Sequence, residues 1–141
     1  MSKLDVLLDQ YGETHRNPVN KAIHWVCVPL IMWSALAALW VGSPLAVCVA
    51  VALSVVYYAR MSVPMAVGMF AMTALMVAPL PLVGANTLGI AAAVFVLAWI
   101  AQFVGHAIEG KKPKFLQDLQ FLLIGPAWLL QFVYRGVGIR Y

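Results

Sequence analysis

Charged residues are scarce in this chain. Lys and Arg number nine and Asp and Glu five among 141 residues, and none of the four occurs from Ala22 to Ala59 or from Met61 to Ile108. With 64% hydrophobic and 10% charged residues, the composition excludes a soluble globular domain, in which about half of the residues are apolar. The sequence therefore predicts an integral membrane protein.

Cysteine is also rare. Cys27 and Cys48 are the only two, and both stand inside apolar runs. Cysteine in such a place usually packs as a small hydrophobic residue. We therefore expect neither a disulfide nor a cysteine-bound metal.

The apolar runs have the length of membrane-crossing helices. About 20 helical residues cross a hydrocarbon core of about 30 Å. Spans are expected at residues 22–41, 44–59, 64–83 and 88–106. A last stretch, 119–134, is interrupted by Gly125-Pro126 and is either a fifth span or a re-entrant segment. The expected fold is an all-α, polytopic membrane helix bundle of four to five spans that forms a single domain over residues 1–141. The sequence does not determine its oligomeric state.

Residues 1–17 are predicted to form an amphipathic helix that lies on the membrane. Ser2 and Asp5 match a capping box at its start. Residues at helical spacing on one face are Leu4, Leu7, Leu8, Tyr11 and His15. Asn17 suits the N-cap of the next helix, and Pro18 suits its first turn because that turn leaves its N–H groups unused.

Basic residues mark one membrane face. The N-terminal segment, the turn at Arg60 and the loop Lys111–Lys114 carry Lys or Arg, whereas the turns after the first and third expected spans carry none. By the positive-inside rule, the three basic regions face the cytoplasm. The net charge of +4 suits an anionic lipid surface and gives no sign of a nucleic-acid partner.

The chain has only three histidines, His15, His24 and His106. The topology, derived without them, places all three at the cytoplasmic face. A hydrogen-bonded interfacial role is the simpler interpretation of any single one, but ionisable groups near the membrane interior are costly and usually functional. Their convergence favours a metal site. Imidazole with some carboxylate suits iron, zinc or manganese, so ligand type alone does not settle the reaction.

Polar residues accompany two of the histidines. Gln102, His106 and Glu109 follow one another at i, i+4 and i+7, on one face of the fourth expected span. Asn20 and His24 form a similar pair on the first span. The spacing of His106 and Glu109 is also used by metal-binding helices in bundles.

Aromatic side chains gather near the ends of the expected spans. They are Tyr11, Tyr57, Tyr58, Trp25, Trp33, Trp40, Trp99 and Trp128. Such rings usually serve as anchors in the membrane interface. Their positions alone give them no catalytic role.

Two motif blocks resemble a known membrane family. The first block is Tyr11-x-x-x-His15 and Asn20-x-x-x-His24, followed by Pro29, and the second is Gln102-Phe103-Val104-Gly105-His106-x-x-Glu109, followed by Pro113. Their order and spacing, over nearly the whole chain, look like those of the iron(II)-dependent 2-hydroxy fatty acid dioxygenases. That family commonly has Phe-Glu-Lys after the second block's histidine. Here Ile108-Glu109-Gly110 stands in its place, with the basic residues displaced to Lys111 and Lys112.

The resemblance implies an oxidoreductase of lipid alpha-oxidation. Its cofactor would be iron(II), and its substrates molecular oxygen and a 2-hydroxy fatty acid that loses one carbon as carbon dioxide. His15, His24 and His106 are the expected ligands, because three protein ligands leave three positions of octahedral iron for the substrate and dioxygen. The active face would be the cytoplasmic face of a bacterial inner membrane or of the endoplasmic reticulum.

Further residues are expected to assist at the metal. Glu109 is either a fourth ligand or an acceptor that orients His106. Supporting polar groups are Asn20, Gln102 and Tyr11. The substrate carboxylate is expected near Arg16, Lys111 or Lys112.

Two other functions stay open on the sequence alone. One is a haem-binding electron-transfer protein with His24 and His106 as axial ligands. The other is a non-enzymatic scaffold or carrier subunit whose histidines only close hydrogen bonds. Metal content separates the second from the dioxygenase, and a visible absorption spectrum identifies the first.

Overall fold

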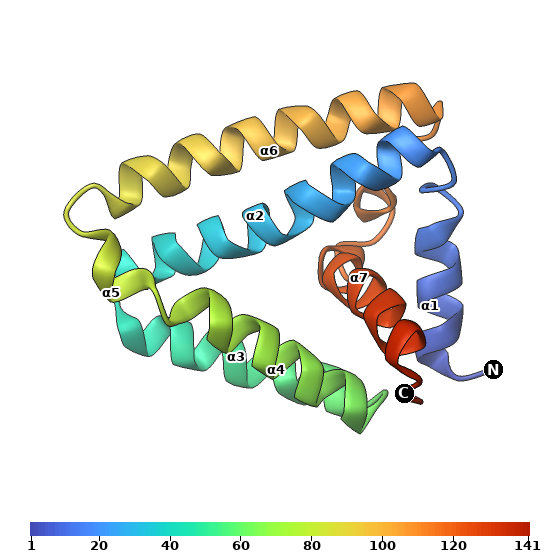
Figure 1. Cartoon of the computed structure of the whole chain (residues 1–141), viewed down its shortest axis with the longest axis horizontal. Coiled ribbons are helices and arrows are strands. Elements are labelled where there is room, and N and C mark those ends of the chain that lie inside the picture. The colour runs from blue at the N-terminus through green and yellow to red at the C-terminus, as the bar shows by residue number, and fades with distance from the viewer.

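Two antiparallel helix pairs diverge from one end of the molecule (Figure 1). The computed structural model describes all residues, 1–141. The longer pair consists of α2 (Pro18–Gly42) and α6 (Thr87–Glu109), which are in extensive contact. The second pair consists of α3 (Pro44–Ala59) and α4 (Val63–Val77), and the short α5 (Leu80–Val83) connects α4 to α6. The structure has no strand, which confirms the all-α prediction.

The remaining elements lie where the two pairs are furthest apart (Figure 1). Helix α1 (Lys3–Gly12) packs against α7 (Phe121–Val137), and the 3-10 turn η1 (Lys114–Leu116) precedes α7. Both chain termini lie at this end. The start of α2 and the end of α6 also meet here, so four segments distant in sequence surround one region.

Helix α1 begins at the predicted capping box. The amide of Asp5 donates to Ser2 Oγ at 3.1 Å, and the Asp5 carboxylate accepts from the amide of Ser2 at 2.8 Å. The Ser2 backbone N–H holds the pKa of the Asp5 carboxyl below its usual value. The predicted apolar face of α1 exists, and it is buried against α7 rather than open to lipid; its members are Leu4, Leu7, Leu8 and Tyr11.

The helices differ in length from three of the expected spans. Helix α2 begins at Pro18, as predicted from Asn17 and Pro18, and Asn17 Oδ1 accepts the amide of Val19 at 2.9 Å and caps the helix. Helix α6 continues to Glu109. The span expected at 64–83 is divided between α4 and α5, at the place where Pro79 and Pro81 remove backbone donors.

Helix α7 is continuous through Gly125-Pro126. The expected interruption at this dipeptide is therefore wrong. Proline inside a helix opens the preceding turn, and in that turn the carbonyl of Leu123 accepts a hydrogen bond from the Tyr58 hydroxyl on α3. Both Gly125 and Pro126 are buried, so packing against neighbouring helices holds the segment in helical form.

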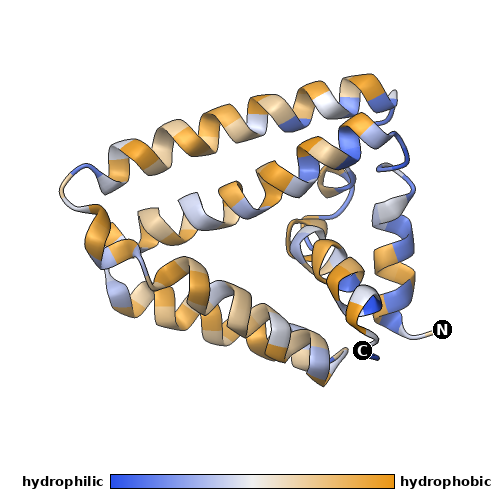
Figure 2. Cartoon of the chain, in the orientation of Figure 1, coloured by the Kyte–Doolittle hydropathy of each residue, from blue (hydrophilic) through white to orange (hydrophobic).

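The helices have the composition of membrane spans. Three segments are long and apolar enough to cross a bilayer, namely Pro18–Gly42, Val63–Val83 and Thr87–Glu109, and α3 and α7 are shorter apolar helices. Large apolar side chains such as Leu53, Leu75 and Leu97 are exposed on the outer surface. Hydrophilic residues gather around α1, the start of α2 and the end of α6 (Figure 2). The structure is thus a helical bundle with one polar end.

Candidate metal centre

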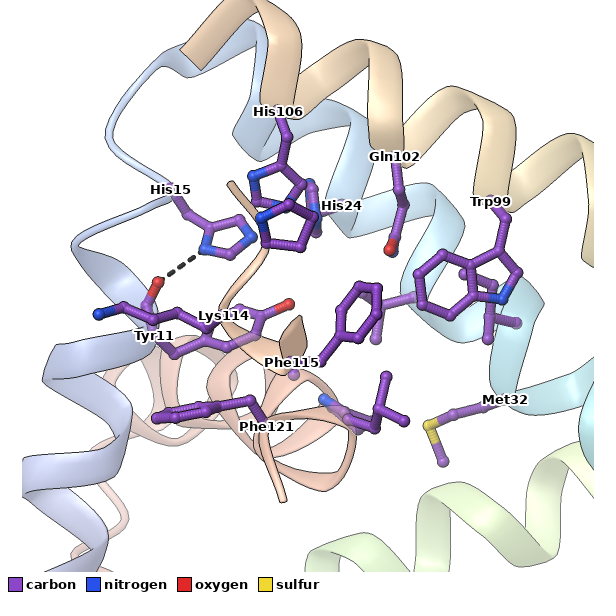
Figure 3. A pocket seen from close by; sticks show the side chains of 16 residues that line it. Tyr11, His15, His24, Met32, Trp99, Gln102, His106, Lys114, Phe115 and Phe121 are labelled. Carbon is purple, nitrogen blue, oxygen red and sulfur yellow. Dashed lines mark hydrogen bonds between the residues drawn. The ribbon is translucent and has the colours of Figure 1, made fainter. Parts of the chain in front are cut away.

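Three histidines from three segments meet at the polar end (Figure 3). His15 lies between α1 and α2, His24 in the second turn of α2, and His106 in the last turn of α6. Their ring centroids are 4.2 Å apart for His15 and His24, 4.8 Å for His24 and His106, and 4.9 Å for His15 and His106. One nitrogen of each lies within 4.8 Å of the others. The predicted convergence is therefore confirmed.

Backbone carbonyls orient two of the rings. His15 Nδ1 lies 2.6 Å from the carbonyl oxygen of Tyr11, and His24 Nδ1 lies 2.9 Å from that of Asn20. A carbonyl oxygen only accepts, so each Nδ1 carries the proton and donates. Both Nε2 atoms therefore have a free lone pair. Metal-binding histidines usually donate their other N–H in this way.

Two imidazole nitrogens in the cluster lack a partner. His15 Nε2 and His106 Nδ1 are buried and make no hydrogen bond. Leaving a buried polar atom unpaired costs about 1–3 kcal/mol, and here two such atoms belong to one cluster. Imidazole nitrogen is a common ligand of iron, zinc and related cations. The donor set thus fits a metal ion, which His15, His24 and His106 would hold.

Tyr11 forms one wall beside His15. Its ring stacks on the His15 ring with centroids 4.1 Å apart and planes 9° apart. Burial, together with the neighbouring His24, lowers the pKa of His15 to about 3, so this imidazole is neutral and able to bind a metal near pH 7. Burial also raises the pKa of the Tyr11 phenol, which keeps its proton.

Glu109 fastens the end of α6 to the connection that carries His15. Its Oε1 accepts the backbone N–H of Arg16 at 3.0 Å, and its Oε2 accepts the N–H of Asn17 at 2.8 Å and the side-chain amide of Asn20 at 3.2 Å. The carboxylate makes no hydrogen bond with His106, and it is not among the side chains that converge as possible ligands. Its observed partners are the residues that follow His15.

Asn20 links the same segments from within. It is fully buried, and its amide nitrogen also donates to the carbonyl of Thr14 at 3.0 Å. Its carbonyl oxygen Oδ1 lies against Gly105, where a Cβ atom would overlap it. A glycine at 105 is therefore what allows α2 and α6 to approach closely beside the histidines.

A small pocket opens beside the three rings (Figure 3). Its volume of about 60 Å³ holds only a few water-sized groups. Gln102, one turn before His106, points its side-chain oxygen into this space. The aromatic part of the wall comprises Tyr11, Trp99, Phe115 and Phe121. The pocket thus combines metal-binding nitrogens, one amide and apolar rings.

The basic side chain that lines this pocket is Lys114. It forms a salt bridge with Glu13 at 3.3 Å, and the Lys114 side chain is only 15% exposed. Arg16, Lys111 and Lys112 do not line the pocket. Lys111 instead donates to the backbone carbonyl of Glu13 at 3.0 Å. The sequence alone places Lys114 in the basic loop that determines topology. Only the fold of η1 shows that the Lys114 side chain turns toward the pocket.

Comparison with known proteins identifies the family. Residues 1–137 match the family model described as 2-hydroxy-palmitic acid dioxygenase Mpo1-like. The chain belongs to the Mpo1-like family. No curated protein and no solved structure matches it. The family description agrees with the resemblance of the two motif blocks, and those blocks contain the three histidines that converge.

The geometry disfavours both other functions. A porphyrin cannot fit between His24 and His106, because the adjoining space is about 60 Å³ and His15 lies within 4.9 Å of both rings. A purely structural role requires that the histidines close hydrogen bonds. Two of their nitrogens instead remain buried without partners.

Proposed function

We propose that this protein is an iron(II)-dependent dioxygenase that shortens a 2-hydroxy fatty acid by one carbon. The observation that carries the proposal is the convergence of three imidazoles, two of them with unpartnered buried nitrogens. Membership of the Mpo1-like family supports the substrate class. The Fe(II) assignment rests on the redox chemistry that this substrate class requires, since imidazole ligands alone also suit zinc.

The overall reaction balances with dioxygen alone. A 2-hydroxy acid and one O2 give the acid with one carbon fewer, carbon dioxide and water. The bond between C1 and C2 breaks, C2 is oxidised to a carboxyl carbon, and dioxygen is reduced. Iron(II), when bound, would supply positions for the substrate oxygens and dioxygen and the electrons that activate it.

The side chains of the pocket would bind and orient the substrate. The Lys114 ammonium would attract the carboxylate, and the Gln102 carbonyl oxygen would accept a hydrogen bond from the 2-hydroxyl group. Tyr11, a neutral phenol against His15, would fix that ring. The surrounding aromatic rings would exclude water. Arg16, Lys111 and Lys112, on the outer surface, would raise the local concentration of the anionic acid.

The site would face the cytoplasm from an integral membrane position. The polar end that holds the histidines (Figure 2) is also the end with the basic N-terminal segment and the Lys111–Lys114 loop, as the positive-inside rule requires. The acid would then remain in the bilayer while its carboxylate reaches the polar end.

An isotope experiment tests the reaction. Detergent-purified protein is loaded anaerobically with iron(II) and given a long-chain 2-hydroxy acid under 18O2, with the zinc-loaded protein as control. We expect the iron protein to form the acid with one carbon fewer, labelled with 18O, and the zinc protein to form none. Absence of any shortened product from the iron-loaded protein would refute the proposal.

A further inference from the structure

A second cavity adjoins the histidine pocket. It has a volume of about 210 Å³ and lies between α2, α3, α4 and α7. Met32, Leu122 and Pro126 line both spaces. In Figure 3, Met32 stands at the side of the histidine pocket away from His15. Met32, Leu122 and Pro126 therefore form a wall shared by the two spaces, on the side that leads away from the polar end.

One face of α2 runs along both spaces. His24, Val28 and Met32 line the histidine pocket, and Met32, Leu36 and Leu39 line the second cavity. These residues follow one another at intervals of three or four, so they share a helix face. At about 1.5 Å per residue, the stretch from His24 to Leu39 rises by about 22 Å. This length suits a long alkyl chain that lies along α2.

The second cavity offers a ligand no free hydrogen-bond donor. Ser54, Tyr58 and Thr73 are its only polar lining residues. The Ser54 hydroxyl donates to the carbonyl of Val51, the Thr73 hydroxyl to that of Met69, and the Tyr58 hydroxyl to that of Leu123. No charged residue lines the cavity. Its walls therefore favour a hydrocarbon over any polar ligand.

We propose that this cavity receives the alkyl tail of the substrate and that Ala35 and Ala50 determine the longest chain accepted. The inference rests on the proposed function and specifies how that same site selects its substrate. The histidine pocket has room only for the carboxylate end, so the tail must leave it, and Met32 belongs to the wall that the two spaces share. Ala35 on α2 and Ala50 on α3 have the smallest side chains of the lining. Enlarging either shortens the space for the tail.

Chain-length profiles of alanine variants test this inference. The kcat/KM values for 2-hydroxy acids of increasing length are compared for Ala35→Leu, Ala50→Leu and the control Ala38→Leu. Ala38 is an exposed alanine of α2 that does not line the cavity. For the longest acids we expect Ala35→Leu and Ala50→Leu to lose about tenfold or more, the discrimination that small changes make in an apolar pocket. Short acids should keep their wild-type values, and Ala38→Leu should keep the whole profile.

A labelling experiment tests the binding site without turnover. A 2-hydroxy acid with a photoreactive diazirine at the far end of its chain is irradiated with the protein, and the labelled peptides are identified by mass spectrometry. We expect label on α2 beyond Met32 and on α3, and a loss of it in Ala35→Leu.

The two failures are distinguishable. If the wild type converts no 2-hydroxy acid, the proposed function fails while the labelling still locates the tail. If the wild type is active but Ala35→Leu and Ala38→Leu share one profile, or if label appears only on outward residues such as Leu97, the tail site is refuted.

Discussion

Gly105 of α6 lies so close to Asn20 of α2 that a methyl group at position 105 would overlap the Asn20 side-chain oxygen. Both residues neighbour metal-ligand candidates: Gly105 directly precedes His106 in the chain, and the backbone carbonyl of Asn20 accepts a hydrogen bond from His24 Nδ1. The spacing between α2 and α6 at this point therefore also sets the spacing between two of the three imidazoles.

Gly105→Ala should destabilise the protein and lower its metal content. Alanine at an open helical position is more stable than glycine by up to about 1 kcal/mol, whereas overpacking costs about 1–3 kcal/mol. The control is Gly89→Ala on the same helix, where an added Cβ meets no atom within 4 Å. Thermal unfolding in detergent should show a lower midpoint for Gly105→Ala and an equal or higher one for Gly89→Ala. Identical behaviour of the two variants would contradict the close contact.

Each histidine should be needed for metal binding. His15→Ala, His24→Ala and His106→Ala should each lose most of the metal, because two imidazoles hold a cation much less tightly than three. Wild-type protein should contain about one metal ion per chain, as expected for a single cluster of three ligands. The control is Ser34→Ala, which removes a buried hydroxyl bonded within α2. Wild-type metal content in any two of the histidine variants would exclude the three-histidine site.

Glu109→Gln should weaken activity without abolishing metal binding. The carboxylate of Glu109 accepts the backbone N–H groups of Arg16 and Asn17. Glutamine keeps one acceptor oxygen, but its NH2 group would face the other N–H, so one of these hydrogen bonds is lost. Supporting groups around metal ligands typically contribute about 10- to 100-fold. Metal content and kcat/KM are measured on the same preparation. A loss of metal equal to that of His106→Ala would make Glu109 a ligand.

Lys114 should contribute to substrate binding more than its neighbour Lys112. Lys114 lines the histidine pocket, whereas Lys112 lies in an outer groove. Lys114→Met should raise KM about tenfold, as loss of about 1.4 kcal/mol of binding would, and Lys112→Met should change KM little. Steady-state kinetics with one 2-hydroxy acid measure both. A larger rise in KM for Lys112→Met than for Lys114→Met would indicate that the substrate carboxylate binds in the outer groove.

Cysteine labelling should place all three histidines on one membrane side. In a Cys27→Ala, Cys48→Ala background, cysteines at Ser2 and Lys112 should react with an impermeant reagent from the cytoplasmic side. A cysteine at Ser43 should react from the other side, because only the first two positions lie in basic regions. Ser43 lies between α2 and α3, at the opposite end of α2 from its start at Pro18. Labelling of Ser2 and Lys112 from opposite sides would rule out a shared metal.

The apolar helices and the histidine cluster could be predicted from the sequence because their signals are local. Long uncharged runs mark helices, and basic turns mark one end, so His15, His24 and His106 fall together without any knowledge of packing. The expectation that aromatic rings anchor the interface fails for Tyr58 and Trp128, which are 1% and 2% exposed. A ring's burial depends on which helices pack around it.

Long-range packing also explains the other differences. The inward position of Lys114 depends on η1, and the continuity of α7 through Pro126 depends on neighbours such as Tyr58. Glu109 was expected near His106 from helical spacing, but its carboxylate turns toward Asn17, on a segment 92 residues earlier. Helical periodicity determines which face a side chain occupies and leaves its partner undetermined.

Because His15 lies outside the helices, the stability of the N-terminal segment should depend on the metal supply. Two candidate ligands belong to spans, while the third belongs to the connection after α1, which Glu109, Lys111 and Lys114 hold in place. A metal ion that binds only when this connection is docked against α2 and α6 stabilises the docked state. The stabilisation is about 2.7 kcal/mol at a free metal concentration 100 times Kd. The N-terminal helix should therefore resist proteolysis in proportion to the free metal concentration, so that scarcity of the ion would reduce the amount of intact protein as well as its activity.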